Sequence, residues 1–422
     1  MLISDLKLKK EGGLATLSAL VEFELAKVSA RILRISVPVS YEGMLHAGYE
    51  AFLLGCYSAA LYHNEERIHV QGAICPYLKN QLTSALILQK RWWFPKGFNL
   101  PEITAEQYIA PSLPTDRKAG CFFSGGVDSL ASILVNNHNF ETNHQYRYKY
   151  AFLAYGLDIG DPNRSEDDEL FKRALENQGG VADEMGLTLI PIWTNMRDIE
   201  PNGWFYEYLQ VGSLLSGLAH AVSNSVSRCS IAADHTPEYM IPTGNHIFLN
   251  SYLTSSYLQF YSEVSHLDRT DKVGLIAQNE IALSSIRVCY YTNNIKLGHI
   301  NCGYCEKCLR TKLGLLAHGK LSECNAFPNL DIDKSYLLSV DITEEHGMEY
   351  YNDHLANLLE KQGETSYADI VRTINGHPAL KYKIKRYTSQ SYITTKLKER
   401  LKQLYRYLKR VSRTRRILKS FH

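Results

Sequence analysis

The stretch Cys121-Phe-Phe-Ser-Gly-Gly-Val-Asp-Ser-Leu130 decides the interpretation of this 422-residue chain. Its apolar start is typical of a short strand, and its end opens a run that favours a helix. The glycines Gly125 and Gly126 allow a tight turn that brings backbone N–H groups close to an anion. The hydroxyls of Ser124 and Ser129 add donors, and the start of a helix adds positive potential. The stretch therefore predicts a phosphate-binding loop between a strand and a helix.

Asp128 stands out in this loop, because a carboxylate beside a polyphosphate repels it. A bridging Mg²⁺ ion would remove that repulsion, so we expect one in the site. The loop has neither the Gly-x-x-x-x-Gly-Lys spacing of a Walker A motif nor the Gly-x-Gly-x-x-Gly spacing of a dinucleotide fingerprint. An ordinary Gly-Gly turn with a serine cap is the alternative interpretation.

Runs typical of strands and of helices alternate from Arg117 onward. The strand-like runs cover residues 121–123, 150–155, 187–193 and 228–233. The helix-like runs between them cover residues 129–135, 169–185 and 206–222. This alternation favours an α/β fold with a parallel, doubly wound sheet that helices cover on both faces.

These patterns divide the chain into four parts. Residues 1–115 are interpreted as an α+β module, whose proline-rich and polar stretch 95–114 is read as a linker. Residues 116–325 form the predicted α/β domain. Residues 326–380 form a charged helical extension, and residues 381–422 form a basic amphipathic tail with leucines along one face of a predicted helix.

The formal net charge of +2 hides an uneven distribution. Residues 381–422 hold fifteen lysines and arginines against one acidic residue, so the preceding 380 residues carry a net charge of −12. Such a tail can bind an acidic patch of the protein or of a partner macromolecule, an anionic membrane surface, or RNA. A solvated helix that packs through its leucines is the simplest alternative.

The first ten residues mix charges and contain no apolar signal core. The two longest stretches without charged residues are rich in small polar residues, which disfavours a membrane span. We therefore expect a cytoplasmic protein.

Nine cysteines in a chain of this kind favour metal binding over disulfides. Three of them occur in Cys302-Gly-Tyr-Cys-Glu-Lys-Cys308, and a fourth lies thirteen residues before this run. Four thiolates fill a closed tetrahedral shell, so we predict a structural Zn²⁺ site with the ligands Cys289, Cys302, Cys305 and Cys308. An iron–sulfur cluster and unligated thiols are the alternatives. The other five cysteines are interpreted as packing residues.

Ligands of parallel α/β sheets lie beyond the carboxyl ends of the strands, and this rule selects further polar residues. The candidates for nucleotide contact chosen in this way are Asp158, Asn195, Arg197 and His246. Thr194, Asp234 and His235 satisfy the same rule, and Arg310 follows the cysteines closely enough to reach the site. Arg269 and Lys272 are three residues apart, so on one helical face they could bind departing pyrophosphate. Solvated loop side chains and a surface ion pair are the alternatives.

With both motifs together, the chain resembles the PP-loop ATP pyrophosphatases, and among them the 7-cyano-7-deazaguanine synthases (QueC). The resemblance covers residues 119–319. It implies that residues 124–129, with Val127 among them, hold the phosphates of ATP while a substrate oxygen attacks the α-phosphate. We assign catalytic roles to Asp128 and Ser129 on this resemblance, and to Arg269 and Lys272 on their spacing. The implied cofactors are ATP, Mg²⁺ and Zn²⁺.

The resemblance implies a ligase that adenylates a carboxylate or carbonyl oxygen for attack by ammonia or an amine. The N-terminal module, the longer gap before the cysteine triplet and the C-terminal extension differ from QueC, so the acceptor is left open. A tRNA-base-modifying PP-loop enzyme is the second hypothesis, because of the basic tail. A non-catalytic nucleotide-binding component of a defence or polysaccharide-assembly system is the third. We expect a homo-oligomer.

Overall fold

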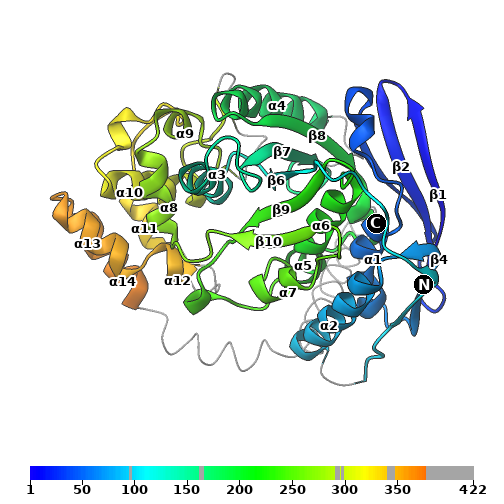
Figure 1. The fold of residues 1–422 in the computed structure, drawn as a ribbon. Helices are drawn as coiled ribbons and strands as arrows, with labels where there is room; N and C mark the ends of the chain where they lie inside the picture. Colours follow the sequence, from blue (N-terminus) through cyan, green and yellow to red (C-terminus); the bar gives the residue numbers. More distant parts are fainter. Residues whose placement is uncertain (95–96, 161–165, 290–294, 296–298, 340–346, 377–422) are drawn as a thin grey trace, which may run out of the picture.

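The computed structural model describes residues 1–94, 97–160, 166–289, 295, 299–339 and 347–376. These residues form an α/β fold around a ten-stranded sheet (Figure 1). The predicted α/β class is therefore confirmed. The basic tail, residues 381–422, and the leucine-lined helix predicted within it lie outside the described residues.

The sheet joins strands from both halves of the chain. The strands are β1 (Leu2–Glu11), β2 (Leu14–Glu22), β3 (Arg31–Pro38), β4 (Arg67–Ile74), β5 (Glu102–Tyr108), β6 (Lys118–Phe122), β7 (Tyr148–Tyr155), β8 (Thr188–Thr194), β9 (Val226–Ala232) and β10 (Gln259–Glu263). Their order across the sheet is β10-β9-β6-β7-β8-β3-β2-β1-β4-β5. Within the described chain, the pairs β1–β2, β2–β3 and β3–β8 are antiparallel and the other neighbours are parallel.

Helices lie between most of the strands and form a group after β10. They are α1 (Glu50–Tyr62), α2 (Pro76–Trp93), α3 (Val127–Asn139), α4 (Glu166–Glu184), α5 (Gly203–Phe205), α6 (Val211–Ala221), α7 (Ile247–Ser251), α8 (Arg269–Ala277), α9 (Glu280–Ser285), α10 (Glu306–Ala317), α11 (Lys334–Ser339), α12 (Gly347–Tyr350), α13 (Asp353–Lys361) and α14 (Thr365–Gly376). A π-helix, η3 (Tyr206–Gln210), runs directly into α6.

Five neighbouring strands, β10-β9-β6-β7-β8, are parallel. After β6 the chain adds β7 and β8 on one side, and it then crosses through α6 to place β9 and β10 on the other side. The connections that follow β6 and β9 therefore diverge and leave a crevice between them. Ligands of open α/β sheets bind at such a switch point, and the predicted phosphate loop follows β6 directly.

Helices cover both faces of these parallel strands (Figure 1). Cys121 of β6 belongs to the core shared with α3, α8 and α10, whereas the next residue, Phe122, belongs to the core shared with α1 and α6. Ala151 and Phe152 of β7 divide between the two cores in the same way. Because successive side chains of a strand point to opposite faces, an apolar run without alternation indicates a strand covered on both sides.

The first 108 residues extend the same sheet by five strands. The antiparallel joint between β3 and β8 consists of two residue pairs, and helix packing reinforces it. Helix α1 lies against α6 so closely that a Cβ added to Gly217 would come within 2.6 Å of the carbonyl oxygen of Ala51. Glycine at this position therefore allows the two halves to share one core.

The linker interpretation of residues 95–114 is wrong for the middle of the segment. Glu102–Tyr108 form β5, which pairs in parallel with β4 at the edge of the sheet. Ile103 is its buried residue, and most of the others are intermediate or exposed. An edge strand of this kind has the polar composition of a loop, because one of its faces is solvated.

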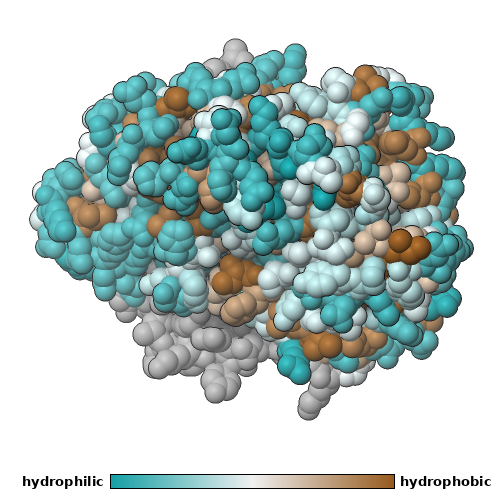
Figure 2. Space-filling view, in the orientation of Figure 1, coloured by the Kyte–Doolittle hydropathy of each residue, from teal (hydrophilic) through white to brown (hydrophobic). Residues whose placement is uncertain are grey.

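The face of the molecule in Figure 2 is mainly hydrophilic, with separate hydrophobic areas. In the described ranges, no helix combines the length and the apolar character that a bilayer crossing requires.

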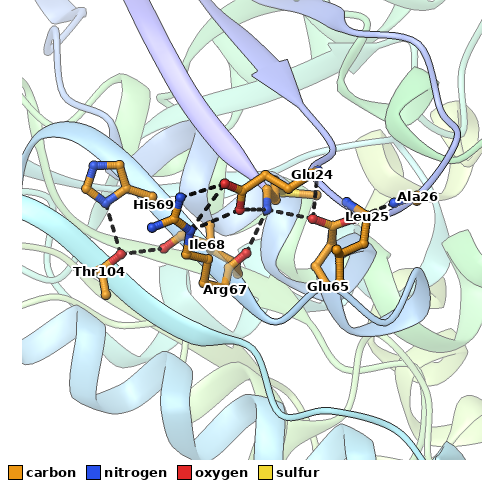
Figure 3. A network of polar contacts seen from close by, with 9 residues as sticks. Glu24, Leu25, Ala26, Glu65, Arg67, Ile68, His69 and Thr104 are labelled. Atoms are coloured by element: carbon orange, nitrogen blue, oxygen red, sulfur yellow. Dashed lines mark hydrogen bonds and ion pairs between the residues drawn. The ribbon is translucent and has the colours of Figure 1, made fainter.

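A network of charged groups fixes the first strand to the start of β4 (Figure 3). The α-ammonium of Met1 donates to Glu65 Oε2 at 2.6 Å and to Glu24 Oε2 at 2.8 Å. Glu65 also accepts from the backbone N–H groups of residues 24–26 at 2.9–3.0 Å. Arg67 Nη2 donates to Glu24 Oε1 at 2.7 Å. Because the Glu65 carboxylate is fully buried, these donors replace the water that it loses on folding.

Replacing Glu65 with Gln should remove a buried negative charge and leave the Met1 ammonium without its closest partner. We expect the free energy of unfolding to fall by about 3 kcal/mol, the usual effect of removing one member of a buried ion pair. Urea unfolding at neutral pH measures it. The neighbouring Glu66 is exposed, so Glu66→Gln is the matched control and should change stability by less than about 0.5 kcal/mol. Equal effects of the two substitutions would contradict the role of the network.

The same network predicts a dependence of stability on pH. Hydrogen bonds from Arg67 and from the Met1 ammonium lower the pKa of Glu24 from 4.5 to about 2. Because the folded pKa is the lower one, the stabilisation is complete above the unfolded value of 4.5 and is lost as the pH falls toward 2. In a Glu24→Gln variant, the urea midpoint should therefore decline less steeply over this range. Parallel curves for the two proteins would show that Glu24 does not contribute.

Candidate functional site

The glycine loop connects β6 to α3, in the place that the sequence predicts. Gly126 is the N-cap of α3, so the loop ends where the first backbone N–H groups of the helix are unpaired. Gly125 has a φ of +76°, which favours glycine, and an added Cβ would lie 2.3 Å from the Gln178 side-chain amide and displace it. The backbone N–H of Arg287 donates to the Gly125 carbonyl at 2.8 Å. This bond ties the loop to the segment that precedes the cysteines.

A cavity of about 840 Å³ opens above the loop. Its size lies in the range of small-ligand sites. Its walls come from the carboxyl ends of β6, β7 and β9, from η3, from the start of α10 and from residues 350–351. The predicted site residues that line it are Ser124, Gly126, Val127, Asp128, Ser129, Asp158, Arg197 and Arg269. The structure therefore brings most of the predicted nucleotide contacts together.

Two cations from α8 hold the Asp128 carboxylate. Arg269 Nη1 donates to Asp128 Oδ2 at 2.8 Å, and Lys272 Nζ donates to Asp128 Oδ1 at 2.9 Å. Lys272 is fully buried and also donates to the Ala233 carbonyl at 2.7 Å. The spacing of three residues places both cations on one face of α8. Asp268 is the N-cap of this helix and forms a capping box with Asp271, which fixes the residue at which the helix begins.

The crowding of charges in the cavity shifts several pKa values. Burial alone would raise the pKa of Asp128, but the two cations of α8 outweigh it, and this pKa lies far below its usual range. Burial and the nearby Asp128 carboxylate raise the pKa of Asp234. Burial, followed by the repulsion from Arg310 and Arg269, lowers the pKa of Lys307 to about 8. This side of the cavity therefore concentrates positive charge, which favours an anionic ligand.

Asp158 and Arg197 lie at the end of the cavity next to β7. Tyr206 Oη donates to Asp158 Oδ1 at 3.0 Å, and the Arg197 guanidinium lies 4.0 Å above the Tyr206 ring. Arg197 also donates to the Leu157 carbonyl at 2.8 Å. Tyr206 comes from the π-helix η3, and such wide turns are frequent at functional positions.

Three predicted nucleotide contacts, Gly125, Asn195 and His246, are not among the residues that line the cavity, and neither is Lys272. Asn195 accepts from the backbone N–H of Arg34 at 2.7 Å and donates back to β3 at 3.0 Å, so its amide extends the joint between β3 and β8. His246 accepts from the backbone N–H of Phe248 at 3.1 Å, and its ring lies 4.8 Å from that of Trp92. Burial lowers the pKa of His246 to about 4, which suits a neutral ring in a packed position.

The cavity also contains residues that the sequence analysis missed. They are Arg287, Glu306, Lys307, Tyr350 and Tyr351. The first three lie within two residues of a predicted metal ligand. Their position next to the cysteines was the feature of the sequence that could have identified them. Arg310, a candidate in the sequence, lines the cavity as well.

The four predicted cysteine ligands meet in one buried cluster. All four Sγ atoms lie within 4.8 Å of one another. The separation is 3.4 Å between Cys305 and Cys308, 3.8 Å between Cys302 and Cys308, and 3.9 Å between Cys289 and Cys305. The cluster could therefore hold a metal ion.

The donor set fits a tetrahedral ion. Sulfur atoms bound at 2.3 Å to a tetrahedral Zn²⁺ lie about 3.8 Å apart, and the observed separations are close to this value. They are too long for a disulfide. Asn301 links the segment before Cys289 to the residues after α10. Its Oδ1 accepts from the backbone N–H groups of Val288 and Cys289. Its Nδ2 donates to the carbonyls of Ile286 and Ala326.

The cysteine cluster supports one wall of the cavity. Cys289 belongs to both. Cys305 is the N-cap of α10, and the first turns of this helix present Glu306, Lys307 and Arg310 to the cavity. An ion bound by the four cysteines would therefore fix the cationic side of the cavity relative to the glycine loop.

Comparison of the chain with family models, curated proteins and solved structures finds no match.

We expect the purified protein to contain about one metal ion per chain, and we expect Cys305→Ser to lose it because one of the four thiolates is missing. Elemental analysis measures the stoichiometry and identifies the metal, which distinguishes zinc from an iron–sulfur cluster. Cys324→Ser is the matched control, because this buried thiol donates to the Leu283 carbonyl outside the cluster. Full metal content in the Cys305 variant would contradict the site.

Proposed function

We propose that this protein is an ATP-dependent adenylating enzyme of the PP-loop type, which converts ATP to AMP and pyrophosphate while it activates an acceptor oxygen. One observation carries the proposal. The Ser-Gly-Gly-Val-Asp-Ser loop lies at the switch point of the parallel sheet, and its Asp128 faces Arg269 and Lys272 at the cavity. An ordinary glycine turn would need neither the cavity nor the two cations.

The loop has the groups that a triphosphate requires. The backbone N–H groups at the start of α3 and the hydroxyl of Ser124 can donate to phosphate oxygens. The Ser129 hydroxyl donates to the Gly126 carbonyl at 3.1 Å and would have to rotate to do the same. In the proposed reaction, the acceptor oxygen forms a bond to the α-phosphorus. The bond from that phosphorus to the bridging oxygen breaks, and its electron pair leaves with pyrophosphate. Arg269, which lines the cavity, can stabilise the negative charge that develops on this leaving group, and the buried Lys272 adds positive charge next to Asp128.

The acidic residues of the cavity fit a Mg²⁺ ion, which prefers oxygen ligands and commonly binds substrate phosphates together with one or two carboxylates. Asp128 and Asp234 both line the cavity, and the Asp128 carboxylate contributes to the raised pKa of Asp234. A bound Mg²⁺ would neutralise part of the phosphate charge. Arg269 and Lys272, which pair with Asp128 in the structure, would then share that carboxylate with the ion.

We propose Zn²⁺ for the cysteine cluster and a structural role for it. Four thiolates complete the shell of a tetrahedral ion, so no position is left for a substrate. The chain's own contribution is to place Arg287, Lys307 and Arg310 along the cavity wall.

The acceptor in this proposal is a carboxylate or carbonyl oxygen, with ammonia or an amine as the attacking nucleophile, as the resemblance to QueC suggests. The alternative of a non-catalytic nucleotide-binding protein uses the same loop and differs in having no turnover. The alternative of a tRNA-modifying enzyme depends on the basic tail, which lies outside the described residues.

The test follows the products of α-labelled ATP. The protein is incubated with Mg²⁺, ammonium and fractionated cell extract, and AMP and pyrophosphate are measured together. We expect equal amounts of both with an extract fraction that contains the acceptor. Asp128→Asn should lower the rate about 100-fold or more, because it removes a charge next to the reacting phosphates.

Asp183→Asn is the matched control for this experiment, since Asp183 is exposed on α4, away from the cavity lining. It should leave the rate unchanged. Formation of ADP and phosphate would overturn adenylation. ATP binding without turnover in any fraction would favour the non-catalytic alternative.

A further inference from the structure

Residues 349–354, here named the C-terminal strap, reach back from the helical extension to the cavity. They include the end of α12 and the start of α13. Tyr350 and Tyr351 line the cavity together with the phosphate loop. The resemblance to PP-loop enzymes ends before this part of the chain, so it assigns no role to the strap.

A buried contact between a carboxylate and an imidazole anchors the strap next to β9. The Glu349 carboxylate is fully buried, and its Oε2 lies 2.5 Å from Nδ1 of His235. Its Oε1 accepts from the backbone N–H of Thr236 at 3.3 Å. His235 follows Asp234, and both line the cavity. A buried carboxylate needs such partners, so Glu349 fixes the position of the residue that follows it.

Tyr350 faces Arg269 of α8 and Arg310 of α10. The side of the cavity that these two helices form is named the cationic wall. The Arg310 guanidinium lies 3.8 Å above its ring, and the Arg269 guanidinium lies 5.7 Å from the ring centre. A guanidinium that stacks on an aromatic face keeps its N–H edges available for oxygen acceptors in its own plane. One of these edges, at Arg269, already donates to Asp128. The buried Nε of Arg269 has no hydrogen-bond partner among the described residues.

The other strap residues bind the helices that carry these arginines. Tyr351 Oη donates to Glu306 Oε1 at 3.0 Å, and Glu306 Oε2 lies 3.4 Å from Nη1 of Arg310 on α10. Asn352 Nδ2 donates at 3.1 Å to the Oδ2 of Asp268, the residue that caps α8. His354 lies at the same distance from that oxygen. The strap thus contacts both helices of the cationic wall at their amino-terminal ends.

We propose that Tyr350 is a positioning residue of the nucleotide site, and that the strap holds Arg269 and Arg310 in the orientation that binds the phosphates of ATP. The inference rests on the proposed function and extends it, because it makes the C-terminal extension part of the nucleotide site. We expect the strap to affect the affinity for polyphosphates, because the guanidinium groups of Arg269 and Arg310 are suited to contact phosphate oxygens.

The test measures the affinity of Mg-ATP and of Mg-pyrophosphate for a series of variants at position 350. Tyr350→Leu keeps a large apolar side chain but removes the aromatic face. We expect it to lower the affinity for both ligands about 5- to 30-fold, which is the range of a desolvated cation–π contact. Tyr350→Phe keeps the face and should bind within about 2-fold of the natural chain. Thermal unfolding without ligand shows whether each variant is folded.

A second pair of variants tests the anchor. Glu349→Gln removes the carboxylate that contacts His235 and Thr236, and it should weaken the binding of both ligands. Glu360→Gln removes a charge on the same extension, where Glu360 pairs with Arg372 at the surface, and should have no effect on affinity. Equal affinities for the natural chain, Tyr350→Leu and Glu349→Gln would overturn the positioning role and leave the proposed function intact. If the natural chain binds neither ligand, the proposed function and the inference both fail.

Discussion

The backbone hydrogen bond from Arg287 to Gly125 is the contact on which the candidate site depends. It joins the loop after β6 to the segment that leads into the cysteine cluster, and it can form because glycine adopts a positive φ at this point. The side chain of Gln178 packs against the same glycine from α4. Three parts of the chain that are distant in sequence therefore meet at one residue, and each of them contributes to the position of the cavity.

Most of the features that could be predicted depend on the spacing of neighbouring residues in the sequence. The alternation of strands and helices, the glycine loop and the four cysteines depend on residues close together in sequence, and the structure places them as expected. Asn195 shows the limit of such rules, because it does follow a strand end but its amide completes the joint with β3. Tyr350 shows the opposite limit. It belongs to the cavity only through tertiary packing, and no nearby motif marks it.

The sequence patterns also could not predict that strands from both halves of the chain form one continuous sheet. Each half has strands that are recognisable alone, but the pairing of β3 with β8 depends on two strands that are more than 150 residues apart. Helix α1 then packs against α6 and gives both halves a common core. The β8 edge of the parallel strands is therefore covered by another part of the same chain. Covering an edge in this way protects it from pairing with other molecules.

The strap has a consequence for the order in which the site forms. Asp128 and its partner Arg269 are separated by 141 residues, and His235 and its partner Glu349 are separated by 114. During synthesis the glycine loop leaves the ribosome early, whereas one wall of its cavity is among the last described parts to be made. Domains begin to fold as they emerge, so a growing chain holds the loop and the cysteines well before the cavity is complete. The proposed nucleotide site would then be complete only after the chain through residue 354 has been made.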